Sequence, residues 1–285
     1  MRLDKYVCQK LPELSRTRVQ KLIADGHITV NDQLAKPGLK INIGDKLKIV
    51  IPPTPPSRLV PEAMPLNILY EDDDLLVVDK PAGLTVHPAP GHPSHTLMNA
   101  LLSHFPHLAD ISNSLRPGIV HRLDKDTSGV MLVAKNSSAQ IHLAEQFKSR
   151  SVTKAYMVLV KGKLTPEAGI IEAAIGRDPR HRQRMAVVAG GREARTEYRV
   201  VKYIGDYTLL EVMPETGRTH QIRVHLAAIG FPVVGDKIYG VKSPYLDRQF
   251  MHACRLGFSL PSTGKYVEFK SELPPDLEQA LKDIA

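Results

Sequence analysis

Residues 118–134 read GIVHRLDKDTSGVMLVA. The two ends of this stretch, 118–120 and 130–134, are apolar and read as strand-like runs. Between them lies a polar segment that carries Asp124 and Asp126, and Thr127, Ser128 and Gly129 favour a turn there. The pattern predicts two strands joined by a short polar connection.

Further strands and helices are expected on both sides of this stretch. Strand-like runs lie at 68–70, 75–78, 155–160, 197–203 and 208–212, and helices are expected near 96–104, 138–148 and 219–229. Strands therefore outnumber helices, and several strands follow one another through turns. This pattern favours an α+β fold with mixed or antiparallel sheets over a doubly wound parallel sheet.

A proline cluster divides the chain. Six prolines fall within residues 52–65, and such a run forms neither a helix nor a central strand but an extended linker. We therefore expect a small domain at 1–51, a proline-rich linker at 52–65 and a large domain at 66–285.

The small domain carries most of the excess positive charge. Residues 1–60 hold 11 Lys/Arg against 5 Asp/Glu, whereas the whole chain has 38 against 30. A basic patch is typical of a protein that binds a polyanion. A solvated surface that keeps the protein soluble is the alternative.

One predicted helix combines this charge with a core stripe. Ser15 can cap a helix at about 16–25, which Gly26 ends, and strands follow at 27–30 and 46–51. The apolar stripe consists of Val19, Leu22 and Ile23. The basic residues on the other faces, which we expect to contact phosphates, are Arg16, Arg18 and Lys21.

Composition excludes several classes of protein. No apolar run approaches the roughly 18 residues of a membrane span, and the charged N-terminus is unlike a secretory signal. Cys8 and Cys254 are too far apart in sequence for a disulfide framework or zinc motif. No phosphate-binding loop or dinucleotide fingerprint is present. We expect a cytoplasmic protein with no membrane partner.

Two segments are candidates for chemistry. Asp124 lies on a loop between strands, which suits a catalytic carboxylate, although an exposed charged turn is the alternative. The second segment is GRTHQIRVHL, 217–226, with Ile222, Leu226 and Ile229 as its core stripe. The residues on its flanking faces suit a polyanion or a buried carboxylate: Arg218, His220, Arg223 and His225.

Metal binding is the rival interpretation of these histidines. His220 and His225 are five residues apart, about 140° around a helix, whereas helical zinc pairs use i, i+4 spacing. The three histidines of HPAPGHPSH, 87–95, lack accompanying acidic or cysteine ligands. We therefore expect no metal site.

Two further features suit a nucleic-acid interface. Tyr156, in TKAYMVLV, faces either the core or a ligand. Residues 176–199 hold seven arginines and three acids, and a loop around Pro179 carries Arg177, Arg180, Arg182 and Arg184. The residues alone indicate an α+β protein that interacts with RNA or DNA, and they leave open whether it is an enzyme that uses a carboxylate.

At these motifs the sequence resembles the RluA/RluD-type pseudouridine synthases. KPAGL (80–84), HRLDKDTSG (121–129) and GRTHQIRVHL occur in that family's order, and residues 87–101 resemble its usual continuation. RLDKYV (2–7) and SRTRVQKLIADGHITVN (15–31) resemble the S-four-type RNA-binding domain. The resemblance implies a small N-terminal α/β RNA-binding domain and a larger mixed, mainly antiparallel β-sheet catalytic domain of pseudouridine synthase type.

The resemblance also implies a reaction and its residues. These enzymes isomerise uridine in RNA to pseudouridine without a cofactor. Asp124 becomes the essential carboxylate, Tyr156 stacks on the target base, and Arg223 forms a salt bridge with Asp124. Arg122 helps to fill the space that the flipped nucleotide leaves, and Arg218 and His220 are expected to contact RNA.

Several alternatives stay open at this point. Asp124 can attack the ribose or remove its 2′ proton. Large-subunit ribosomal RNA is the expected substrate of a monomeric enzyme, with transfer RNA as the nearest alternative. A non-catalytic ribosome-binding or assembly protein is the alternative from another class, and retention of Asp124 argues against it.

Overall fold

A computed structural model of the chain describes residues 1–11, 16–52, 59–89, 91–111, 116–181 and 184–284. The chain forms two compact units, Met1–Pro56 and Ser57–Ala285. The smaller unit has a hydrophobic core of its own, whose residues range from Leu3 to Ile49 along the sequence. Within the described residues, no helix combines the length and apolar character needed to cross a membrane.

The smaller unit packs two helices against a short antiparallel sheet. Its elements are α1 (Leu3–Lys10), α2 (Arg16–Ala24), β1 (Ile28–Val30), β2 (Gln33–Leu34) and β3 (Leu47–Ile49), with strand order β2-β1-β3. The predicted helix and its stripe are confirmed, because Val19, Leu22 and Ile23 are buried and Gly26 ends α2 with φ of +77°.

The structure describes one of the three basic side chains that are predicted to contact phosphates. Lys21 is exposed on α2. Ser15, the predicted helix cap, and the side chains of Arg16 and Arg18 lie outside the described residues.

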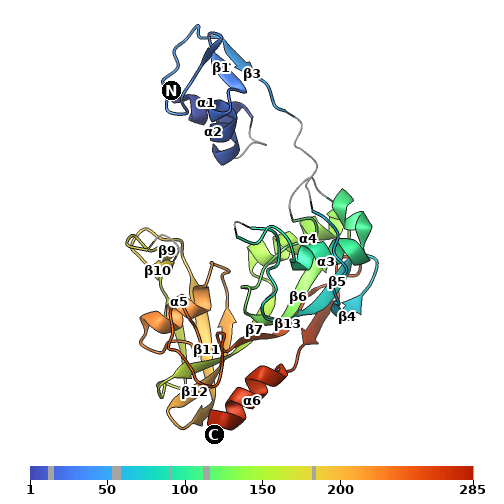
Figure 1. Cartoon of the computed structure of the whole chain (residues 1–285), viewed down its shortest axis with the longest axis vertical. Helices are drawn as coiled ribbons and strands as arrows, with labels where there is room; N and C mark the ends of the chain where they lie inside the picture. The colour runs from blue at the N-terminus through green and yellow to red at the C-terminus, as the bar shows by residue number, and fades with distance from the viewer. Residues whose placement is uncertain (12–15, 53–58, 90, 112–115, 182–183, 285) are drawn as a thin grey trace. The chain divides into compact units, whose positions relative to one another are not determined.

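The larger unit is built on one mixed, mainly antiparallel sheet, as predicted (Figure 1). The strand order is β4-β5-β6-β13-β7-β12-β11-β8, with β14 beside β13, and β6–β13 is its parallel pair. A separate hairpin consists of β9 (Ile175–Arg177) and β10 (Met185–Val187). The sheet strands are β4 (Asn67–Glu71), β5 (Leu75–Lys80), β6 (Ser128–Ala134), β7 (Thr153–Lys161), β8 (Ala168–Glu172), β11 (Arg195–Ile204), β12 (Tyr207–Pro214), β13 (Met251–Ser259) and β14 (Tyr266–Lys270).

Helices cover both faces of this sheet. They are α3 (Leu97–His104), α4 (Ser137–Ser149), α5 (Gln221–Ala228) and α6 (Pro275–Ile284), with a 3₁₀ turn η1 (Pro106–Asp110). On β5, Leu76 and Val78 pack with α3, whereas Leu75 and Val77 pack with α4, as the alternation of a strand requires. Tyr156 contacts both the α3 core and the α5 core, so these two helices share one face.

The stretch 118–134 folds differently at its first half. The predicted strand at 118–120 is wrong, because Gly118 has φ of +74° and Ile119 makes only an isolated bridge to Val133. The turn also lies earlier than predicted, at Lys125 and Asp126, and Ser128 already belongs to β6.

Gly129 shows why a glycine stands at the start of β6. Its φ is +115°, and a Cβ there would lie 2.2 Å from the carbonyl oxygen of Ala253 on β13. Only glycine therefore permits the two backbones to meet at this point.

Part of the predicted linker is bound to the larger unit. The amide of Asn99 on α3 donates to the Val60 carbonyl at 2.8 Å, and the Glu62 N–H donates to the Asn99 carbonyl at 3.0 Å. The His104 ring donates to the Met64 carbonyl at 2.9 Å. These residues therefore move with α3 rather than spacing the two units.

Candidate active site

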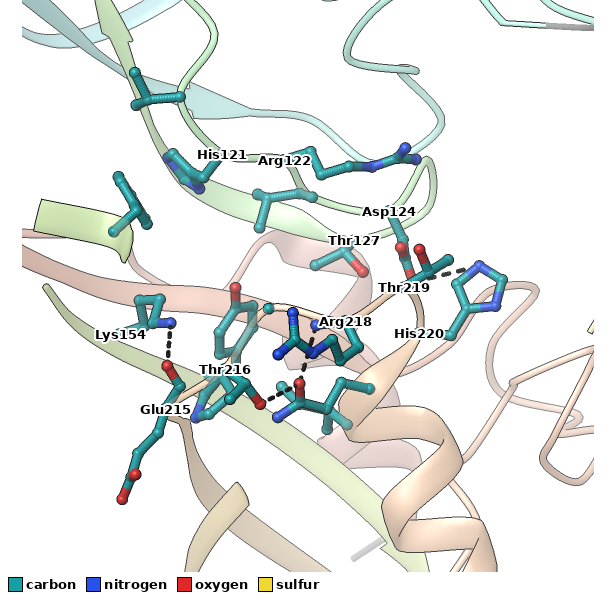
Figure 2. A pocket seen from close by; sticks show the side chains of 18 of the residues that line it. His121, Arg122, Asp124, Thr127, Lys154, Glu215, Thr216, Arg218, Thr219 and His220 are labelled. Atoms are coloured by element: carbon teal, nitrogen blue, oxygen red, sulfur yellow. Dashed lines mark hydrogen bonds and ion pairs between the residues drawn. The ribbon is translucent and has the colours of Figure 1, made fainter. Parts of the chain in front are cut away.

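A pocket of about 570 Å³ opens on the sheet face that carries α3 and α5 (Figure 2). Three segments supply most of its walls: the loop before β6, the end of α4 together with the start of β7, and the loop before α5. Tyr156, Arg122, Arg218 and His220 line it together with Asp124. The structure therefore brings most of the predicted large-domain site into one cavity.

Lys80 holds the loop that carries Asp124. It ends β5, its side chain is buried, and its Nζ donates to the carbonyls of Pro81, Leu84 and Lys125 at 2.8, 2.9 and 3.0 Å. Burial lowers the pKa of Lys80 to about 7, although Asp126 and Asp124 oppose this shift. Three carbonyl acceptors use all three N–H groups of an ammonium, which favours the charged form.

Asp124 forms an ion pair with Arg223, as the resemblance implies. The Nη1 of Arg223 donates to Oδ2 of Asp124 at 2.9 Å. The side chain of Arg223 is 5% exposed and that of Asp124 15% exposed, so water screens this pair only weakly.

Asp236 holds the other side of the same guanidinium. Nε and Nη2 of Arg223 donate to its two carboxylate oxygens at 2.7 and 2.8 Å. Asp236 is fully buried and also accepts the backbone N–H groups of Ile238 and Tyr239. Burial acts to lower the pKa of Arg223, but Asp236 and Asp124 raise it by more, so the net shift of this pKa is upward. Arg223 is therefore a fixed cation that presents one N–H to Asp124.

The ring of His220 lies close to the Asp124 carboxylate. Its Nε2 is 3.9 Å from Oδ2 of Asp124, and its Nδ1 is 2.9 Å from the Tyr239 hydroxyl. Burial lowers the pKa of His220 despite the opposing effect of Asp124, which favours the neutral ring. Its φ of 56° is left-handed, a conformation that costs a non-glycine residue about 1 kcal/mol or more.

Gln221 explains the conformation of the GRTHQIR segment. Its Oε1 accepts from the Thr216 hydroxyl at 2.7 Å and from the Arg218 N–H at 3.0 Å. Its Nε2 donates to the Arg195 carbonyl and the Thr196 hydroxyl on β11. The chain up to residue 220 is thereby pinned to the sheet as a loop, and α5 begins at Gln221 rather than at 219.

The remaining features of α5 separate its histidines. His225 is buried, and its two ring nitrogens contact Thr196 and the Ala173 carbonyl at 2.9 Å, so it faces away from the partners of His220. Ile229 is 38% exposed, which makes its predicted place in the core stripe wrong. Among the described residues, no three His, Cys, Asp or Glu side chains group as metal ligands do.

Tyr156 lies on β7, partly buried, between the two cores of this face. Burial raises the pKa of its hydroxyl, and Asp124 adds to the shift. The side chain is therefore a neutral phenol that presents an aromatic ring to the pocket.

The described residues of the predicted arginine loop lie next to strands β9 and β10. Arg184 donates to the Ile238 carbonyl and lies over the Tyr239 ring, which links the hairpin to the Asp236 segment. Arg177 ends strand β9 rather than lying in the loop, and Arg182 lies outside the described residues.

Several site residues were not predicted, and Asp236 is the most important. One signal was available: Asp236 follows the buried Val233 and Val234 and sits between Gly235 and Gly240. A buried arginine on a helix also requires a carboxylate. Without the fold, however, nothing joined residue 236 to residue 223.

Comparisons with known proteins point to one family. The family model described as RNA pseudouridylate synthase matches residues 74–228, and that of the S4 domain matches residues 1–47. An uncharacterised RNA pseudouridine synthase of Chloroflexus aurantiacus is 49% identical, over 99% of this chain and 90% of that protein. A ribosomal large subunit pseudouridine synthase D of Nitrosomonas europaea is 45% identical, over 100% of this chain and 84% of that protein.

A solved structure is also similar. Human RNA pseudouridylate synthase domain containing 1 superposes with a TM-score of 0.61 and 32% sequence identity, over 76% of this chain and 87% of that one.

Proposed function

Since the chain belongs to the RNA pseudouridylate synthase family and carries an N-terminal S4 domain, we propose that it isomerises specific uridines of large-subunit ribosomal RNA. The class of activity, an isomerase acting on RNA, follows from the family. The choice of RNA is supported by the relative from Nitrosomonas europaea, whose name specifies the ribosomal large subunit.

The observation that carries the proposed mechanism is the Asp124–Arg223–Asp236 arrangement. Arg223 pairs with Asp124 and orients its carboxylate in the pocket, because Asp236 fixes the guanidinium from behind. An ionised carboxylate can attack C1′ of the ribose or remove a 2′ proton. Either route breaks the bond from N1 to C1′ and allows C5 to replace N1.

The reaction needs no redox partner. The composition of the nucleotide is unchanged, because a C5–C1′ bond replaces the N1–C1′ bond, C5 gives up its proton to solvent and N1 takes one up. We propose accordingly that the enzyme uses no redox cofactor. We further propose that it needs no other cofactor and no metal, and that it acts as a cytoplasmic monomer.

Base flipping supplies the substrate to Asp124. A uridine stacked in RNA hides its reacting atoms, and extruding it costs a few kcal/mol. The pocket volume of about 570 Å³ lies in the usual range for small ligands. Stacking on Tyr156 would return about 1–3 kcal/mol, and Arg122, exposed at the rim, is placed to enter the gap in the RNA.

Release of tritium from C5-labelled uridine tests this function. We expect release from a large-subunit ribosomal RNA transcript and none from a transfer RNA transcript. Release from transfer RNA alone would support the alternative substrate, and release from neither, with tight ribosome binding, would support the non-catalytic alternative.

Substitutions of Tyr156 test the stacking role. Tyr156→Phe is expected to retain RNA affinity because the ring face survives, whereas Tyr156→Ala loses about 1–3 kcal/mol of binding. Filter binding to the same transcript measures both. Equal affinities of the two variants would contradict stacking.

Deletion of residues 1–56 tests the small unit. Its core is separate, so we expect a folded remainder with weaker RNA binding and little change in single-turnover rate at saturating RNA. Each lost phosphate contact flattens the dependence of log affinity on log salt by about 0.7–0.9. Losing Arg16, Arg18 and Lys21 would therefore flatten it by about two.

A salt titration of the truncated and full-length proteins measures this slope. An unchanged slope would mean that the basic unit does not touch the substrate, and collapse of the rate in a folded truncate would mean that it helps to build the active site.

A further inference from the structure

The pocket lining carries much more positive than negative charge. Only Asp124 and Glu215 supply carboxylates among the lining residues. The lining cations are Arg116, Arg122, Lys148, Arg150, Lys154 and Arg218. Arg223, which pairs with Asp124, is not one of these lining cations. The excess positive charge of the lining therefore has a cause other than the Asp124–Arg223 pair.

Neither carboxylate neutralises the wall that carries Lys154. Asp124 is paired with Arg223, and the carboxylate of Glu215 is paired with Arg195 on β11. Within the part of the chain that the structure describes, the hydrogen-bond acceptor of Lys154 is the backbone carbonyl of Glu215, at 3.4 Å. Figure 2 shows the Glu215 carboxylate directed away from Lys154, and Lys154 on the opposite side of the pocket from Asp124.

The cations of this wall repel one another. Burial and, to a smaller extent, the charge of Arg150 lower the pKa of Lys154 to about 8. Burial likewise lowers the pKa of Arg218, with further contributions from Arg192 and Arg150. Arg150 therefore lies within electrostatic reach of both Lys154 and Arg218, and a bound anion would relieve the repulsion among the three.

Arg150 occupies a position that its backbone does not favour. It follows α4 with φ of 63°, the left-handed conformation in which helices usually end on glycine. An arginine there gains from the helix dipole but accepts strain that glycine would avoid. Its exposed side chain lines the pocket, which points to a role in binding.

Lys154 also has a fixed relation to the proposed base platform. Residues two apart on a strand project from the same face, about 6.6 Å apart, and Lys154 and Tyr156 on β7 both line the pocket. A nucleotide with its base on Tyr156 therefore has Lys154 within reach of a neighbouring phosphate.

We propose that Arg150, Lys154 and Arg218 form a subsite for one phosphodiester that flanks the target uridine. The inference rests on the proposed function, since it takes RNA as the ligand. Arg218 is partly occupied, because its Nε donates to the Glu193 carbonyl at 2.9 Å. Arg150 and Lys154 make no ion pair with an acidic side chain among the described residues, so they supply the subsite's unneutralised charge.

A thermodynamic cycle that combines a protein variant with a neutralised phosphate of the RNA tests the subsite. The probe is a short single-stranded RNA with one central uridine, in which each linkage in turn is a neutral methylphosphonate. For the full-length wild type we expect one linkage next to the uridine to lose about tenfold or more in affinity by fluorescence anisotropy. For Lys154→Met this linkage should cost less than about twofold, because the partner charge is already absent.

Three further variants separate binding from structure. Lys154→Arg should restore the sensitivity to that linkage because it keeps the charge. Arg150→Gly should lower RNA affinity while leaving the melting temperature unchanged or higher, because glycine suits the left-handed backbone. Lys202→Met, at an exposed lysine of β11 outside the pocket, is the matched control and should behave as wild type.

If each methylphosphonate linkage lowered the affinity of Lys154→Met by the same factor as that of the wild type, the subsite would be overturned. It would also be overturned by an Arg150→Gly protein that binds RNA as wild type does. The affinity cycle does not depend on turnover, so failure of tritium release with an intact cycle would refute the proposed reaction and leave the phosphate subsite standing.

Discussion

Asp124→Asn is expected to abolish uridine conversion while leaving RNA affinity within a few-fold of wild type. Asparagine keeps the shape and can still accept the hydrogen bond from Arg223, but it supplies neither a nucleophile nor a base. A group in this role contributes roughly 10²–10⁴-fold to the rate. Arg223 stays paired with Asp236 in the variant, so the fold should not suffer.

Tritium release and filter binding on the same transcript measure the two halves of this expectation. Asp126→Asn, two residues along the same turn, is the matched control and should retain most activity. Substantial turnover by Asp124→Asn would remove Asp124 from its proposed role.

Arg223→Lys is expected to lose most activity, by about 10²-fold or more, and to lower the melting temperature. The planar guanidinium serves two carboxylates with three N–H groups, and the single ammonium of lysine does not reproduce this fork. Arg223→Ala should be worse, since it leaves the fully buried Asp236 without its partner at about 3–5 kcal/mol.

A matched arginine separates geometry from charge. Arg255 also faces two carboxylates, Glu211 at 2.9 Å and Glu268 at 3.6 Å, but its side chain is 29% exposed. Arg255→Lys should therefore change stability and turnover little. Full activity of Arg223→Lys would show that the two-sided fit does not matter.

The fold could be predicted where local pattern decides it. The helix of residues 16–25 and the strands near 155–160 and 208–212 form as their apolar spacing indicates. The strand predicted at 118–120 was wrong because the positive φ of Gly118 turns the chain. A three-residue apolar run carries no information about such a turn.

Strand β13 was missed for a different reason. β13 is central to the sheet, yet its sequence MHACRLGFS mixes polar and apolar residues. His252 is buried there because Ser128 and the Ser271 carbonyl satisfy its ring nitrogens, and Arg255 pairs with Glu211. These partners lie far away in sequence, so the strand lacks a periodic signal.

The candidate site divides in the same way. Residues carried by contiguous motifs, such as Asp124 and Arg223, could be proposed from the family resemblance. The family matches confirm the resemblance itself. Lys80, Asp236 and Lys154 act through contacts with backbone carbonyls or with residues of other motifs. Such contacts exist only once the sheet has assembled.

The most direct test maps pseudouridine in ribosomal RNA from cells that lack the gene. Carbodiimide treatment and primer extension across the large-subunit RNA should show loss of the signal at one or a few uridines. Expression of the wild-type protein should restore the signal, and expression of Asp124→Asn should not. An unchanged large-subunit map, or equal restoration by Asp124→Asn, would contradict an aspartate-dependent synthase that acts on this RNA.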